Sequence, residues 1–117
     1  MSMNRYKPVG RIVTITSGGV AQTAGLYLGD LTLLGIRLPA TFDGTTVTFT
    51  GSDTLAGTYD PIYNDDGSAY TVTCAASRYT VVDYTKFLGV LFVKVVPGTT
   101  QATTDTIITL YLAPLLT

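Results

Sequence analysis

The sequence predicts an all-β domain of about eight to nine short antiparallel strands with almost no helix. Threonine makes up about a fifth of the 117 residues, and valine, isoleucine and tyrosine are also common. Branched and aromatic side chains fit the pleated, half-buried surface of a sheet. Twelve glycines and five prolines divide the chain into short segments, which is the spacing of a two-sheet β-sandwich or a barrel.

The strands are placed by alternation of apolar and polar residues. Val47 and Phe49 point one way and the threonines between them point the other, and Leu34, Ile36 and Leu38 are predicted to share a buried face. Such a period of two indicates strands with one face on the core. The predicted strands run near residues 11–16, 20–28, 32–38, 46–51, 59–63, 70–74, 78–82, 90–96 and 105–113.

Two of these strands are apolar on nearly both faces, at residues 90–96 and 105–113. In the second of them Ile108, Leu110 and Leu112 are expected to face the core. A strand without a polar face is a central strand, or its outer face lies in an interface.

Few segments are predicted to be anything other than strand or turn. Asp83 is in position to cap a single helical turn over residues 84–87. Gly44 and Gly67 follow aspartates in turns that need a positive φ. The threonine-rich stretch at residues 98–105 is predicted to be a long, mobile loop.

The chain is divided into an N-terminal arm, residues 1–10, and a single β-sandwich domain, residues 11–117. The arm has no apolar stretch of a signal peptide, and it is either a frayed end or an extension that reaches a neighbouring subunit. Charged residues make up only 13% of the chain, against about 25% in an average domain. The chain therefore has more apolar surface than one small core needs, so either its strands are buried on both faces or a partner covers part of that surface.

The residue types needed for most catalysis are missing. There is no histidine and no glutamate, so Ser52 and Ser77 have no histidine base. Cys74 is predicted to be a small buried hydrophobic residue and not a nucleophile. The seven basic residues are scattered, which argues against nucleic acid as a ligand. We therefore expect no enzyme activity, no cofactor and a structural role.

Calcium binding is the one metal hypothesis that the sequence raises. Asn64, Asp65 and Asp66, with Asp60 nearby, could supply hard oxygen ligands. The alternative is a hairpin turn, because Asn-Asp-Asp-Gly is favourable turn chemistry. We favour the turn and predict no metal site, since no bidentate carboxylate is placed for the six to eight oxygens that Ca²⁺ takes.

Tyrosine is the residue type that points to function. Eight are present, and tyrosine is enriched in protein interfaces because it combines a large apolar ring with a polar tip. An oligomer would also cover exposed edge strands. The predicted interface residues are Arg5, Tyr6, Lys7, Tyr27, Tyr59, Tyr63 and Tyr111.

Three segments together carry a resemblance to a known group of proteins: LGDLTLLGIRLPATFDGTTVTFTGS, IYNDDGSAYTVT and SRYTVVDYTKFLGVLFVKVVPGTT. They resemble small virion proteins of tailed phages, over roughly residues 28–112, and the order of elements is similar to galactose-binding-like jelly rolls. The resemblance implies a jelly-roll sandwich in a capsid decoration or cement protein, at the capsid surface of a virion assembled in the host cytoplasm. The implied partners are the major capsid protein and copies of the chain itself, as a homotrimer. The alternatives are a carbohydrate-binding or host-adhesion module of a phage fibre, and a tail or head-tail connector component.

Overall fold

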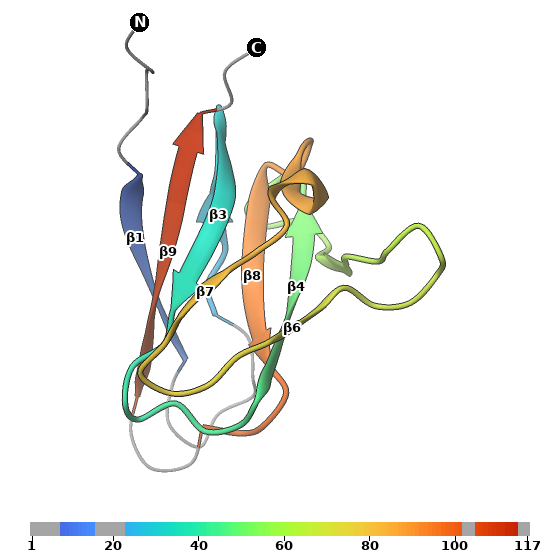
Figure 1. The fold of residues 1–117 in the computed structure, drawn as a ribbon. Helices are drawn as coiled ribbons and strands as arrows, with labels where there is room; N and C mark the ends of the chain where they lie inside the picture. The colour runs from blue at the N-terminus through green and yellow to red at the C-terminus, as the bar shows by residue number, and fades with distance from the viewer. Residues whose placement is uncertain (1–7, 16–22, 102–104, 115–117) are drawn as a thin grey trace, which may run out of the picture.

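The computed structural model describes residues 8–15, 23–101 and 105–114, and it confirms the predicted two-sheet antiparallel sandwich (Figure 1). Among these residues, helix is limited to one 3₁₀ turn, η1. The elements in chain order are β1 (Val9–Ile15), β2 (Leu26–Tyr27), β3 (Leu31–Arg37), β4 (Thr46–Ser52), β5 (Asp60–Pro61), β6 (Thr71–Thr73), β7 (Tyr79–Val81), η1 (Tyr84–Phe87), β8 (Phe92–Pro97) and β9 (Thr106–Pro114).

The strands form a four-stranded sheet in the order β1-β9-β3-β7 and a five-stranded sheet in the order β2-β8-β4-β5. In the second sheet, β5 and β6 pair with the same side of β4. Strand β6 pairs with its first residues, Thr46 to Thr48, and β5 pairs with Thr50 and Gly51. Both of the strands that are apolar on two faces, β8 and β9, lie inside their sheets, which is one of the two alternatives that the sequence left open. Each is therefore flanked by a strand on either side.

The core lies between the two sheets. Ile108, Leu110 and Leu112 of β9 are at most 1% exposed, as predicted. They face a second layer that includes Val47 and Phe49 of β4, both fully buried. Apolar side chains on the inner faces thus alternate with outward-facing ones along each strand, which is the general arrangement of a sandwich.

One turn of helix closes an end of this core. Asp83 caps η1 by accepting a hydrogen bond from the Thr85 amide at 3.0 Å, as predicted. The cap brings Phe87 into the core, where its ring meets Phe49 edge to face, with centroids 5.0 Å apart and planes at 87°. Edge-to-face rings add to the stabilisation that burial alone provides.

Strand β3 departs from the predicted alternation. Its pairing with β9 shifts register between Leu33 and Gly35. Leu33 is fully buried while Leu34 is only half-buried, and Ile36 and Leu38 are buried again. The prediction that Leu34 faces the core is therefore wrong, because a bulge adds one residue to the strand and changes which side chains point inward.

The turns and the long loop are ordered by specific contacts. Gly44 and Gly67 have φ values of +105° and +89°, as their predicted turns require. In the stretch 98–105 the structure describes all but residues 102–104, and Gln101 there is 1% exposed. The described part of the predicted mobile loop thus contains a buried polar anchor.

The ends of the predicted first two strands differ from the structure. Strand β1 begins at Val9, two residues before the predicted start. From Thr23 onward the predicted strand 20–28 is reduced to Leu26–Tyr27, and residues 1–7 and 16–22 lie outside the described part. No helix within the described ranges is long and apolar enough to cross a membrane.

Candidate protein-binding face

The outward side of the four-stranded sheet carries a set of exposed apolar side chains, which we call the apolar face. The exposed fractions are 66% for Ile12, 51% for Tyr79, 76% for Val81 and 50% for Ile107. Tyr111 of β9 is half-buried and lies among them. Strand alternation places all five outward, because the residues between them point into the core. The apolar face is defined as Ile12, Tyr79, Val81, Ile107 and Tyr111.

Two tyrosines form the middle of the apolar face. The rings of Tyr79 and Tyr111 lie 5.1 Å apart, with their planes at 33°. Gly35 pairs with Tyr111 on one side and with Val81 on the other. A Cβ at this glycine would come within 2.8 Å of a ring carbon of Tyr79, so the absent side chain gives the Tyr79 ring its place against the sheet.

The charge on this side of the sheet is low. Arg37 pairs with Thr109 of β9 and with Tyr79 of β7, which places it among the outward residues, and it is exposed. It is the one charged residue that alternation places outward on the described strands of this sheet. Charged residues are depleted from the centre of protein interfaces, and aromatic residues and arginine are enriched there.

The outward side of the five-stranded sheet is mixed in character. Tyr27, Phe92 and Val96 lie outward on β2 and β8, whereas the outward side of β4 and β6 carries threonines. On β4 the threonines alternate with the buried Val47 and Phe49, and on β6 they flank the buried Val72. Thr46 pairs with Thr73 and Thr48 with Thr71, so hydroxyl-bearing side chains stand next to each other across the strands. We call Thr46, Thr48, Thr50, Thr71 and Thr73 the threonine face. The apolar face and the threonine face thus differ in the polarity that they present to the surroundings.

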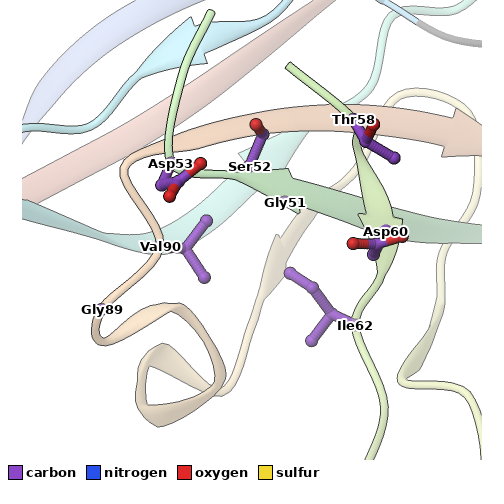
Figure 2. A pocket seen from close by; sticks show the side chains of 8 residues that line it. All are labelled: Gly51, Ser52, Asp53, Thr58, Asp60, Ile62, Gly89 and Val90. Atoms are coloured by element: carbon purple, nitrogen blue, oxygen red, sulfur yellow. The ribbon is translucent and has the colours of Figure 1, made fainter.

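An open pocket of about 390 Å³ lies at the end of β4. Figure 2 shows Asp53 and Asp60 on either side of Gly51, with Val90 and Ile62 below them in this view. The lining contains no aromatic ring on which a sugar could stack. Within the described ranges, no group of three or more histidine, cysteine, aspartate or glutamate residues is placed to hold a metal ion.

In the acidic hairpin that raised the calcium hypothesis, Asn64 and Asp66 form hydrogen bonds within the hairpin. The Asp66 carboxylate accepts hydrogen bonds from the Ser68 amide at 2.9 Å and from the Ser68 hydroxyl. Asn64 donates from Nδ2 to the Ser68 hydroxyl at 3.1 Å. The bonds from Ser68 lower the pKa of Asp66 below its usual value of 3.8, which is the behaviour of a carboxylate in a turn.

The single cysteine is a core residue. Cys74 is 7% exposed and belongs to the same apolar cluster as Val72. Burial raises the pKa of its thiol above the usual value of 9.0. A raised pKa favours the protonated thiol at neutral pH. The buried position of Cys74 agrees with its predicted place in the core.

The structure separates the predicted interface residues. Tyr111 lies on the apolar face, whereas Tyr27 contacts Phe92 of β8 with ring centroids 5.1 Å apart. Tyr59 has the Lys94 ammonium 4.2 Å from its ring centre, and Tyr63 is exposed, next to the acidic hairpin. Arg5, Tyr6 and Lys7 lie outside the described residues. The four described tyrosines thus do not form one surface.

Sequence reasoning missed most of the apolar face. Ile107 was signalled by the doubly apolar segment 105–113, which left an interface open as an explanation. Ile12 and Val81 each lie beside apolar residues that point to the opposite face of the same strand. The pattern alone therefore did not mark them as exposed. Tyr79 was one of eight tyrosines without a distinguishing neighbour. The pairing of strands, which brings these residues to one side of one sheet, was needed to find the set.

Comparison with protein-family models, with curated proteins and with solved structures gives no match for this chain. The apolar face and the pocket are therefore interpreted from their own residues and geometry.

Proposed function

We propose that this chain is a non-enzymatic structural protein of a phage virion, and that it decorates or cements the capsid through its apolar face. The observation that carries the proposal is the exposure of Ile12, Tyr79, Val81 and Ile107 on one side of one sheet. A contiguous exposed apolar patch marks an interaction site in a soluble protein. The virion setting comes from the resemblance of residues 28–112 to small tailed-phage virion proteins.

The partners in this proposal are the major capsid protein and copies of the chain itself. A protein that binds only the assembled shell shifts the assembly equilibrium towards the shell by mass action. The rigid sandwich would present the apolar face to the capsid while the threonine face stays in contact with water. Arg37, next to Tyr79, is the charge available for an acidic group of the partner.

The pocket favours this function over carbohydrate recognition. Sugar sites combine polar groups that fix hydroxyls with an aromatic ring on which the sugar stacks. The pocket offers polar groups from Ser52, Asp53, Thr58 and Asp60 beside the apolar Ile62 and Val90, but its lining has no aromatic ring. The exposed Tyr27 and the half-buried Tyr59 each contact another side chain on the five-stranded sheet.

The test uses purified particles of the phage that encodes the chain. Mass spectrometry is expected to find the protein in them, and particles that lack it should disrupt at lower temperature. Added protein should bind to these deficient particles in a sedimentation assay, and the double variant V81K/I107K should not bind. The matched variant T71K/T73K changes two exposed residues of the threonine face and should bind normally. Particles that contain none of the protein would contradict the proposal.

A further inference from the structure

Strand β1 forms one edge of the four-stranded sheet (Figure 1). It pairs with β9 over all seven residues, from Val9 opposite Leu112 to Ile15 opposite Thr106, without a register shift. On the side away from β9, no strand of the described part of the chain pairs with it. A regular row of backbone donors and acceptors on an edge strand is a template for another strand.

The other edge strands of the sandwich are much shorter than β1. Strand β7 has three residues, β2 has two, and β5 has two, of which one is Pro61. Short edge strands and proline are the usual means of blocking edge-to-edge association. Strand β1 is seven residues long and has no proline and no bulge. Its one charge is Arg11, which donates a hydrogen bond to the carbonyl of Gly10.

We propose that β1 pairs antiparallel with β1 of a second copy, about a twofold axis that passes through Ile12. The two four-stranded sheets then become one continuous eight-stranded sheet. Antiparallel pairing of identical strands is self-complementary, so the contact closes as a dimer. The inference concerns the free chain in solution, and it holds whether or not the chain is a virion protein.

The sequence of β1 selects this register. Ile12 is the middle residue of Val9–Ile15, so an axis there pairs all seven residues. Arg11 then lies opposite Val13 of the partner copy. An axis one residue earlier would place the two Arg11 side chains opposite each other, which is unfavourable for like charges on adjacent strands. With the axis at Ile12, two β-branched side chains meet, which is a favourable cross-strand pair.

The dimer also extends the apolar face. Ile12 belongs to that face in each copy, so the two apolar faces adjoin along the new strand pair. The contact between two strand edges is nevertheless small compared with the roughly 1,200–2,000 Å² of a stable interface. We therefore expect a weak, concentration-dependent dimer of the isolated chain. The homotrimer predicted from the sequence would need a different, heterologous contact between copies.

Disulfide trapping tests both the pairing and its register. In the full-length chain, I12C places two cysteines opposite each other across the axis. The Cα atoms of directly opposite residues on paired strands lie within the separation of about 4.4–6.8 Å that a disulfide needs. The matched control T14C changes an exposed residue on the same face of the same strand. Its two copies would lie four residues apart along the strands, about 13 Å, which is out of reach. We expect a crosslinked dimer from I12C and monomer from T14C on a non-reducing gel.

A second control separates edge pairing from stacking of the two apolar faces. I107C changes the next strand of the same face, and in the edge-paired dimer its copies are several strands apart and do not crosslink. In sedimentation of the concentrated chain, I12K should shift dimer to monomer while I107K should not. Crosslinking by I107C in place of I12C, equal loss of association in both lysine variants, a trimeric mass, or a monomer at every concentration would overturn the proposal.

Discussion

Gln101 joins two segments of the chain through its side-chain amide. Oε1 accepts hydrogen bonds from the Asp43 amide at 2.8 Å and from the Thr106 hydroxyl at 3.0 Å. Nε2 donates to the carbonyls of Asp43 at 2.7 Å and Thr99 at 3.0 Å. Four bonds from one buried amide satisfy its hydrogen-bonding capacity, and they hold the turn at Gly44 against the start of β9.

The variant Q101A is expected to lower the free energy of unfolding by about 2–3 kcal/mol, because it removes bonds inside a buried polar network. Urea denaturation followed by circular dichroism measures the change. T100A alters the exposed neighbouring residue and should change stability by less than about 0.5 kcal/mol. Equal, small effects of the two variants would show that the amide does not anchor the loop.

Local residue roles could be predicted from the sequence, and distant ones could not. Gly44, Gly67 and Asp83 act on residues within a few positions of themselves, so their turn and cap chemistry is visible in the sequence. The partner of Gln101 at Asp43 is 58 residues away. A glutamine in a threonine-rich stretch carries no local sign of such a contact, and the stretch was therefore expected to be mobile.

At the scale of elements, the cap of η1 makes the free energy of unfolding depend on pH in the acid range. The hydrogen bonds from Thr85 lower the pKa of Asp83 below its usual value of 3.8. A carboxyl with a lowered pKa in the folded state stabilises that state above its unfolded pKa, and this contribution is lost as the pH falls through the folded value. The difference in unfolding free energy between the wild type and D83A should therefore be constant above about pH 5 and shrink below pH 3.8.

Urea denaturation over pH 2–7 measures this difference. T85V removes the hydroxyl bond that contributes most to the shift. It should move the Asp83 pKa back towards its usual value, which NMR titration of the carboxyl can follow. A D83A effect that is the same at pH 2.5 and pH 6 would show that the carboxylate charge does not contribute to the cap.

The bulge in β3 can be tested by comparing two adjacent leucines. Leu33 is fully buried and Leu34 is half-buried. L33A is expected to cost about 3 kcal/mol in unfolding free energy, within the range for emptying a core leucine site, and L34A about 1 kcal/mol, since less apolar area is removed from the core. Thermal and urea unfolding of the pair give the comparison. A larger loss in L34A would restore the simple alternation that the sequence suggested.

The element boundaries show why alternation alone was insufficient for β3. Its sequence, LTLLGIR, has leucines at positions that point to both faces of a regular strand. The apolar pattern therefore does not decide which face is buried. The choice is made by pairing with β9, which shifts register between Leu33 and Gly35. In β4 and β9 each inward apolar residue has a polar or aromatic neighbour, and there the predicted faces agree with the burial that the structure has.

At the scale of the whole molecule, the apolar face and the threonine face both lie on antiparallel sheets and differ in their side chains. The threonine face has hydroxyls in cross-strand pairs, while the apolar face has isoleucine, valine and tyrosine rings over Gly35. Threonine fits the pleated surface as well as isoleucine and valine do. Folding alone therefore does not require the apolar face, and its side chains are available to be selected for contact.

Replacing Ile12, Val81 and Ile107 together by threonine tests this separation of folding from association. All three are at least half-exposed, and each substitution should change the free energy of unfolding by about 0.5 kcal/mol or less. The triple variant should nevertheless elute clearly earlier from a hydrophobic-interaction column and associate less at high concentration. L55T, which changes an exposed residue in the loop after β4, is the control and should elute close to the wild type. If the triple variant unfolded far below the wild type, the apolar face would be part of the folding core and not a surface kept for a partner.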